Sequence, residues 1–340
     1  MEQATKFMVV DIFIKSFNRP YYLERCIRSI QQFVEGDYVI KVLDDGTSPV
    51  YLEKVKVLFP EVQIFTSPLY QQKWKAIKDH INGVRPYSLF SIPTGFWISH
   101  VKSASPFFLL LEDDIWLTDR FSLSSIIAVM RENNMVKLKV GWQGTPKVNQ
   151  GKIKQLSLNI EQIQPNFSFI NRVVVNNKFK IASVLHYLRL VNINSLLPFY
   201  SIYAVASAFF DKKYWLYLWD GASDKVKEEF QLRKALSWYD TKSSTYGKLI
   251  NESSKTSYIT SVNNSFSHID FDMFRFNYYL NEAWLSGNLD VMNQFPKDFS
   301  VEYIRSFLDN ANDERCNYLK WTKWVNQFKS AYRELGCEVY

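Results

Sequence analysis

The chain has 340 residues, of which 47% are hydrophobic and 16% aromatic, so it can bury one large core or two smaller ones. Its formal net charge of +7 favours anionic partners, but the basic excess is modest and no nucleic-acid recognition motif is visible, so we expect no nucleic-acid partner. No apolar run of about 18 residues predicts a transmembrane helix, and the three cysteines lack zinc-type spacing, as is typical of a reducing compartment. We therefore expect a cytoplasmic protein, with association at the inner face of a membrane left open.

The first 120 residues alternate between strand and helix patterns. "MVVDIFIKSF" predicts a first strand, and Asn18 as N-cap with Pro20 in the first turn predicts a helix over 20–34. The later segments follow the same alternation, with strands predicted at 37–43, 62–66 and 107–111 and helices at 51–59 and 70–84. This order predicts an α/β fold with a mostly parallel, Rossmann-like sheet flanked by helices.

Polar residues follow three of these strands, at Ser16–Asn18, Asp44–Thr47 and Glu112–Asp114. Ligands of open parallel sheets bind beyond the carboxyl ends of the strands, so we expect these clusters to form a site. In "FFLLLEDDIWL" three adjacent carboxylates end a buried run, where they repel one another and lose hydration. They therefore predict a bound cation or ligand.

The rest of the chain is less regular. Residues 145–200 are rich in Asn, Gln and Lys and are interpreted as an insertion or acceptor-side region. "YSIYAVASAFFDKKYWLYL" returns to a sheet-like pattern, "DKVKEEFQLRKAL" predicts a helix, and "SYITSVNNSFSHI" predicts a late strand and loop. From residue 277 onward the pattern is helical and aromatic.

Three of these stretches, "VDIFIKSFNRPYYLERCIRSI", "VIKVLDDGT" and "LLLEDDIWL", together resemble the nucleotide-sugar glycosyltransferases of the GT-A fold, especially inverting family 2. The resemblance implies a GT-A domain over 1–270, with a nucleotide-binding part at about 1–120 and an acceptor-side part at about 121–270, and a helical extension over 271–340. It also implies transfer from a nucleoside-diphosphate sugar, with UDP expected, to a hydroxyl of a glycan or lipid-linked acceptor in polysaccharide biosynthesis. A Mn²⁺ or Mg²⁺ ion would neutralise the departing diphosphate.

The same resemblance assigns roles to individual side chains. Asp114 and His268 would bind the metal, and the donor would be bound by Ser16, Asn18, Asp45, Lys73, Glu112 and Asp113. Lys15 departs from the family, which has a small hydroxyl residue or proline at that position; a lysine there could contact the diphosphate or signal another base preference.

The predicted general base lies in "WDGASDKVKEEFQLRKAL", which resembles the family segment carrying an acidic pair. By this match Glu229 takes the proton of the acceptor hydroxyl. A charged helical face is the plainer interpretation of the same residues, and Glu228, Asp220 and Asp224 stay open as alternatives for the base.

Two other functions are considered. A nucleotidyltransferase would be expected to carry a glycine-rich loop after the first strand, and "KSFNRPYY" has no glycine. The second is a protein of the same fold that binds sugar nucleotides without turnover. It could carry the same acidic clusters, so it stays open as an alternative.

A stripe of aromatic residues runs along the predicted C-terminal helix, at Trp321, Trp324, Val325, Phe328 and Tyr332. A stripe of this kind usually docks on a core. The alternative is a membrane-surface helix that brings the enzyme to a lipid-linked acceptor.

Overall fold

The computed structural model describes residues 9–176, 193–224, 228–262, 266 and 268–339. Its main sheet has nine strands in the described part of the chain. In spatial order they are β4 (Gln63–Thr66), β3 (Tyr38–Asp44), β1 (Val10–Ser16), β5 (Phe107–Glu112), β11 (Ala208–Asp211), β8 (Met135–Lys139), β12 (Thr245–Leu249), β10 (Ile160–Gln164) and β9 (Lys152–Gln155).

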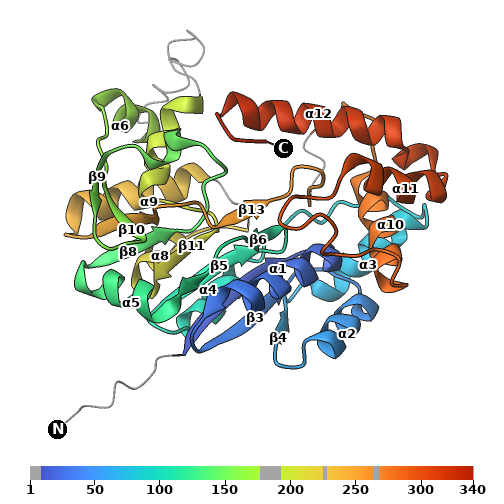
Figure 1. Cartoon of the computed structure of the whole chain (residues 1–340). Helices are drawn as coiled ribbons and strands as arrows, with labels where there is room; N and C mark the ends of the chain where they lie inside the picture. Colours follow the sequence, from blue (N-terminus) through green and yellow to red (C-terminus); the bar gives the residue numbers. More distant parts are fainter. Residues whose placement is uncertain (1–8, 177–192, 225–227, 263–265, 267, 340) are drawn as a thin grey trace.

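The nucleotide-binding half predicted from the sequence forms the parallel part of this sheet. Strand β1 pairs in parallel with β3 and β5, and β3 pairs in parallel with β4. Beyond β5, β11 runs antiparallel to both of its neighbours, and β12 returns parallel to β8. The prediction of an α/β fold with a mostly parallel sheet flanked by helices is confirmed (Figure 1).

Eleven α-helices surround the sheet within the residues described. They are α1 (Pro20–Phe33), α2 (Pro49–Leu58), α3 (Tyr70–Ile81), α4 (Thr94–Lys102), α5 (Leu123–Glu132), α6 (Phe169–Asn176), α8 (Lys212–Trp219), α9 (Glu228–Thr241), α10 (Met273–Leu285), α11 (Val301–Ala311) and α12 (Tyr318–Glu334). Two small sheets pair β6 (Ile115–Leu117) with β13 (Ser254–Thr256) and β2 (Val34–Glu35) with β7 (Phe121–Ser122).

Several boundaries differ from the sequence prediction. The N-cap of α1 is Arg19, and Asn18 precedes it in a left-handed conformation with φ 54°, so Asn18 is not the cap. Helix α4 was not predicted, because the stretch before it is rich in polar and turn-forming residues. The late strand is β13, which ends just before the predicted segment 257–269, and part of that segment lies outside the described residues.

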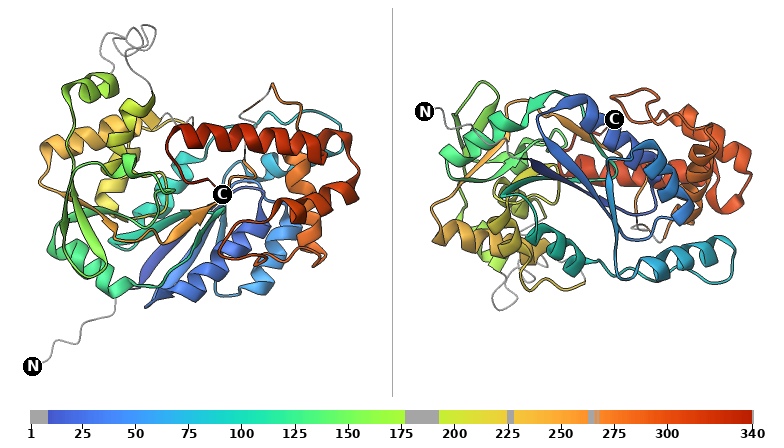
Figure 2. Two further views of the ribbon diagram at one scale, coloured as in Figure 1. Left: turned by 45° about the horizontal axis from the view of Figure 1, so that its top comes forward. Right: turned by 90° about the horizontal axis from the view of Figure 1, so that it is seen from below.

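The two faces of the sheet carry two separate apolar cores, because alternate residues of a strand point to opposite sides. On one face Ile12 of β1 packs in a cluster with Ile27 of α1. On the other face Phe13 of the same strand packs in a cluster with Trp215 of α8 and Leu232 of α9. Figure 2 shows the helices on both sides of the twisted sheet.

Helix α12 returns across the molecule near the carboxyl ends of the parallel strands (Figures 1 and 2). Trp321, Trp324 and Val325 are buried in the same core as β1 and α1, so the prediction that this stripe docks on the core is confirmed. A membrane contact through the stripe would require α12 to leave that core. In the described part of the chain, no helix is both long and apolar enough to cross a membrane.

Candidate active site

The three polar clusters predicted at strand ends come together at one edge of the sheet. In the parallel register Ser16 is the partner of Asp44, and Lys15 is the partner of Glu112. The ends of β1, β3 and β5 are therefore adjacent, as the sequence predicts for parallel strands. The carboxylates that follow β5 face side chains that follow β1.

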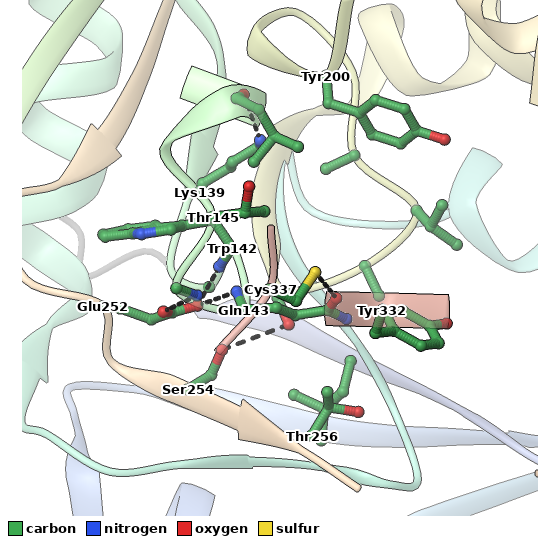
Figure 3. Close-up of a pocket in the computed structure, with 18 of the residues that line it drawn as sticks. Lys139, Trp142, Gln143, Thr145, Tyr200, Glu252, Ser254, Thr256, Tyr332 and Cys337 are labelled. Atoms are coloured by element: carbon green, nitrogen blue, oxygen red, sulfur yellow. Dashed lines mark hydrogen bonds between the residues drawn. The ribbon is translucent and has the colours of Figure 1, made fainter. Parts of the chain in front are cut away.

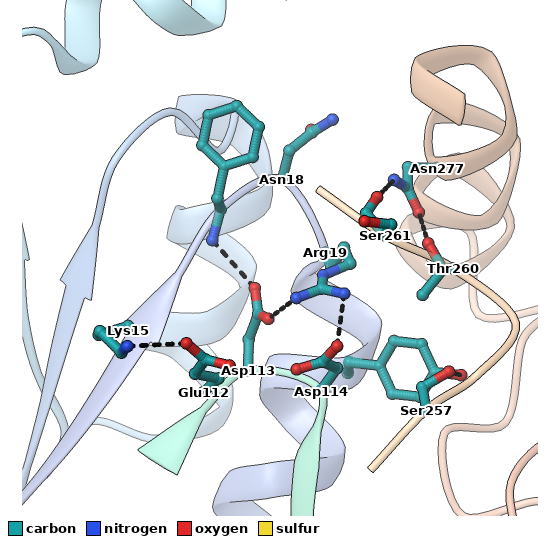
Figure 4. A network of polar contacts seen from close by, with 12 residues as sticks. Lys15, Asn18, Arg19, Glu112, Asp113, Asp114, Ser257, Thr260, Ser261 and Asn277 are labelled. Carbon is teal, nitrogen blue, oxygen red and sulfur yellow. Dashed lines mark hydrogen bonds and ion pairs between the residues drawn. The ribbon is translucent and has the colours of Figure 1, made fainter. Parts of the chain in front are cut away.

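Arg19 holds two of the three adjacent carboxylates. Its Nη2 lies 2.5 Å from Oδ1 of Asp113, and its Nη1 lies 2.7 Å from Oδ2 of Asp114 (Figure 4). Burial alone would lower the pKa of Arg19, but the charges of Asp113 and Asp114 raise it well above its ordinary value. Arg19 therefore stays charged and neutralises the acidic turn from inside the protein.

Asp113 is almost fully buried and has one partner from the chain on each of its oxygens. Its Oδ1 accepts from Arg19, its Oδ2 accepts from the backbone N–H of Phe17 at 2.9 Å, and its side chain is only 1% exposed. Burial raises the pKa of Asp113 to about 7, and Arg19 opposes this shift. Asp113 nevertheless lines the cavity described below, and each of its oxygens keeps a second lone pair, so a contact with the donor stays a prediction.

Lys15 pairs with the third carboxylate. Its Nζ lies 2.7 Å from Oε1 of Glu112, 3.5 Å from the carbonyl oxygen of Val205 and 4.9 Å from the centroid of the Trp97 ring. Burial would raise the pKa of Glu112, but Lys15 and Arg19 bring it below its ordinary value, so Glu112 is ionised. The lysine that departs from the family pattern therefore balances a charge at the strand ends.

The neighbouring acidic pair divides into Asp44, which shapes the turn, and Asp45, which lines the cavity described below. Asp44 is fully buried and accepts from the backbone N–H groups of Gly46 and Thr47 and from the Thr47 hydroxyl, so it shapes the turn. Asp45 accepts from the Ser67 hydroxyl at 2.5 Å and forms a close ion pair with Lys73. The resemblance places Asp45 and Lys73 separately at the donor, and the structure joins them in one ion pair.

A cavity of about 410 Å³ opens above these groups, and we call it the strand-end cavity. Its charged lining is Lys15, Arg19, Asp45, Lys73, Glu112, Asp113 and Asp114, and Ser16 also lines it. At the end where Asp45 lies, the cavity is walled by the aromatic rings of Phe17, Tyr87 and Phe90. Flat apolar walls beside one acceptor and one donor group suit a heteroaromatic base.

A second cavity of about 480 Å³ adjoins the first, and we call it the Tyr200 cavity (Figure 3). Glu112, Gln143 and Tyr332 line both cavities, so the two spaces meet beside the acidic turn. Burial, followed by the charges of Asp114 and Glu112, raises the pKa of Tyr332 to about 12, and Glu228 adds to this effect. The Tyr332 hydroxyl therefore lies within electrostatic reach of carboxylates from both cavities.

The loop after β8 forms one wall of the Tyr200 cavity. The backbone N–H groups of Trp142, Gln143 and Gly144 all donate to the carboxylate of Glu252, the last of them at 2.8 Å (Figure 3). The turn is left-handed at Gln143, with φ 56°, and at Gly144, with φ 70°. Glu252 therefore fixes a loop that borders both cavities.

The predicted acidic pair of α9 is split by the structure. Glu228 lines the Tyr200 cavity, and its Oε2 accepts from the Tyr200 hydroxyl at 2.6 Å. Glu229 is exposed in the first turn of the same helix and is not among the residues that line either cavity. Asp220, an alternative from the sequence, is exposed and pairs with Lys234 at 3.4 Å.

Two other predicted residues lie away from the cavities. The carbonyl and side-chain oxygens of Asn18 accept from the Asn281 side chain, and the Asn18 N–H donates to Thr47, so Asn18 ties the first turn to α10. His268 is exposed, with its ring 6.1 Å from that of Phe266. Neither lines the strand-end or the Tyr200 cavity.

The donor set at the acidic turn fits a divalent cation only in part. Within the described ranges no group of three or more His, Cys, Asp or Glu side chains could hold a metal by itself. The ion pairs use one oxygen of Glu112 and one of Asp114, which leaves the second oxygen of each. Mg²⁺ is usually held by one or two carboxylates together with substrate phosphates and water, and these two oxygens fit that arrangement.

Sequence reasoning missed Arg19, Glu252 and Tyr332. The signal for Arg19 was present in "NRP", where a charge follows a buried strand directly, but its partners are 94 and 95 positions away. Tyr332 is marked only as part of the aromatic stripe and Glu252 by no pattern, because both reach the site only through tertiary contacts.

Comparisons with known proteins give distant structural likenesses. No protein-family model matches the sequence, and no curated protein sequence matches it. The crystal structure of S. aureus TarS 1–349 is similar at 11% identity, covering 95% of this chain and 81% of that one, with a TM-score of 0.42. The same fragment in complex with UDP-GlcNAc is similar at 12% identity over the same shares, with a TM-score of 0.41. Glucosyl-3-phosphoglycerate synthase from Mycobacterium tuberculosis, in complex with Mn²⁺, UDP and glucosyl-3-phosphoglycerate, is similar at 9% identity over 83% of this chain and 81% of that one, with a TM-score of 0.37.

Proposed function

We propose that the chain is an inverting GT-A glycosyltransferase that moves a sugar from a nucleoside-diphosphate sugar, with UDP as the expected nucleotide, to a hydroxyl of a glycan or lipid-linked acceptor. The observation that carries the proposal is the pair of adjoining cavities. One is lined by paired charges and aromatic rings, the other by carboxylates and hydroxyls, and Glu112 and Tyr332 border both. A two-substrate transfer needs two such spaces that meet at the reacting atoms.

The strand-end cavity suits the donor. Asp45 offers an acceptor for the N3–H of a uracil, and Lys73 offers a donor for a neighbouring carbonyl, beside the rings of Tyr87 and Phe90. Lys15 and Arg19 would bring positive charge near the diphosphate. When bound, a Mn²⁺ or Mg²⁺ ion held by Glu112 and Asp114 would supply the charge that stabilises the leaving diphosphate.

The Tyr200 cavity suits the acceptor, and Glu228 is our candidate for the general base. It lines that cavity and is already hydrogen-bonded to a hydroxyl, that of Tyr200, at 2.6 Å. An acceptor hydroxyl that replaces Tyr200 at Glu228 would pass its proton to the carboxylate while its oxygen attacks the anomeric carbon. The sequence favours Glu229, which lines neither cavity and is therefore the matched control.

A thermal-shift screen of UDP-, GDP-, dTDP- and CMP-sugars with and without Mn²⁺ tests the donor assignment, because a ligand that binds the native state raises its stability. The anomeric configuration of the product, read by NMR, tests inversion. Pyrophosphate release from a nucleoside triphosphate and a sugar phosphate would instead indicate a nucleotidyltransferase. Sugar-nucleotide binding without turnover on any acceptor would indicate a binding protein.

Substitutions in the acidic pair test the base. Glu228→Gln keeps the size of the side chain but cannot take a proton, so kcat should fall by about 10²–10⁴ while donor affinity stays unchanged. Glu229→Gln should stay close to wild type. The opposite result, with normal turnover in Glu228→Gln and collapse in Glu229→Gln, would return the assignment to the residue favoured by the sequence.

A further inference from the structure

The chemical class of the acceptor can be argued from the lining of the Tyr200 cavity, and this argument rests on the glycosyl transfer proposed above. Four carboxylates line the cavity, those of Glu112, Glu228, Glu252 and Glu338, together with two amines. Much of the remaining polar lining is uncharged, and it includes Gln143, Thr145, Tyr200, Ser254, Thr256 and Tyr332. Although the whole chain carries a net positive charge of +7, the charged side chains of this cavity are mostly acidic.

The site where an anion would be expected to bind is already filled by the protein. Three successive backbone N–H groups converge in the 142–144 loop, an arrangement that commonly binds phosphate or carboxylate groups. Here all three donate to the carboxylate of Glu252. A phosphate-bearing acceptor therefore finds this cradle occupied by a fixed negative charge.

The buried amine of the cavity is also committed within the chain. Nζ of Lys139 donates to the carbonyl oxygen of Val148 at 2.9 Å and lies 3.3 Å from Oδ1 of Asn149, and the residue is only 3% exposed. The second amine, Lys255, lies on β13 at the border of the same cavity.

The two cavities differ in how their carboxylates are balanced. In the strand-end cavity, Glu112, Asp113 and Asp114 are ion-paired with Lys15 or Arg19. In the Tyr200 cavity the hydrogen-bond donors to Glu228 and Glu252 are a tyrosine hydroxyl and backbone amides, which are neutral. The carboxylates of the first cavity therefore face cations, whereas Glu228 and Glu252 in the second cavity face neutral donors.

We infer that the acceptor is a neutral glycan, a sugar that presents hydroxyl groups and carries no phosphate or carboxylate. Its hydroxyls would donate to Glu228 and exchange hydrogen bonds with Tyr200, Tyr332 and Ser254. A phosphate in the same place would lie against carboxylates of like charge, and like charges at close range repel strongly in a site of reduced dielectric. A phosphate-linked polymer is thus disfavoured as the acceptor.

The test uses the full-length protein with UDP and Mn²⁺ on an array of immobilised glycans, in which neutral oligosaccharides are paired with phosphorylated and uronic-acid forms of the same sugars. We expect binding to neutral members, with at least about tenfold weaker binding to each charged counterpart. Preference for the charged forms, or binding to no neutral glycan at all, would overturn the inference. The donor screen is independent of this array, so a failure here leaves donor binding and the proposed transfer intact.

Charge reversal gives a second measurement. Glu228→Lys should lower binding to the best neutral glycan by about tenfold or more and should narrow the gap to its phosphorylated form. Glu132→Lys, at an exposed position of α5, is the control and should change neither value. Equal effects of the two variants would show that the overall charge of the protein, and not this cavity, sets the preference.

Discussion

Removing Arg19 should unfold or strongly destabilise the chain, because two carboxylates then lose their buried counter-charge. The guanidinium is 6% exposed and lies 2.5 Å from Asp113 and 2.7 Å from Asp114. Removing one partner of a buried ion pair typically costs about 3–5 kcal/mol, since the remaining charge stays desolvated. We therefore expect Arg19→Ala to lower the free energy of unfolding by about that amount.

Urea denaturation at pH 7.5 measures this loss, with Arg28→Ala as the control. Arg28 also forms an arginine–carboxylate pair, at 2.7 Å from Glu24, but it is 42% exposed. Such surface pairs contribute about 1 kcal/mol or less. A loss below about 1 kcal/mol for Arg19→Ala, equal to that of the control, would refute the view that Arg19 neutralises the acidic turn.

The pH dependence of the Arg19→Ala variant follows from Asp113, whose pKa burial has already raised to about 7. Its ordinary value is near 3.8, so the folded state binds the proton more tightly than the unfolded state does. Stability from this group is present below pH 4 and is lost as the pH rises through the folded pKa. Without Arg19 that pKa rises further, so the deficit of the variant should shrink as the pH is lowered from 7.5 to 5.5.

Two further predictions concern other parts of the molecule. Burial lowers the pKa of Lys139 to about 7, so the unfolded state binds more protons between pH 7 and 10.5 and the native state gains stability over that window. Between pH 7 and 9.5 the free energy of unfolding of wild type should therefore rise relative to that of Lys139→Met, by up to about 1.4 kcal/mol per pH unit. Urea denaturation measures both values, and an identical pH dependence of the two proteins would contradict the prediction. Trp324→Ala should cost about 3–5 kcal/mol because the indole is fully buried, whereas Leu319→Ala, 77% exposed on the same helix, should have little effect. A stable Trp324→Ala protein that loses liposome binding would favour the membrane helix instead.

The sequence predicted the strand-end part of the candidate site, because that part depends on which residues directly follow each strand. Strand ends in a parallel sheet fall at one edge, so the sequence alone predicts that the clusters at Ser16, Asp44 and Glu112 lie together, as they do. Apart from α4, which the sequence pattern does not mark, the elements of this half lie close to their predicted bounds, because buried parallel strands are short apolar runs and the helices between them repeat every 3.6 residues.

The lining of the Tyr200 cavity could not be predicted in the same way. It comes from the loop after β8, from Glu252 beyond β12, from Glu228 on α9 and from the end of α12. These segments are far apart in the chain, and none has a pattern that distinguishes a lining residue from a solvated one. The choice between Glu228 and Glu229 shows the limit, because adjacent helical residues point about 100° apart and a one-residue shift in the match exchanges their roles.

The acidic turn itself raises the question of why three carboxylates are tolerated after a buried strand. Two cations, Lys15 and Arg19, pair with Glu112, Asp113 and Asp114. Burial raises the pKa of Asp113 to about 7, so the turn carries at most one uncompensated negative charge. Such a turn is a weak site for a divalent ion alone, but a diphosphate would complete both the charge and the ligand set. Metal and donor should therefore bind together, and by linkage each should raise the affinity of the other by the same factor. On this account Mn²⁺ stabilises the protein against heat only when the nucleotide is present, and Arg19 keeps the turn folded in its absence.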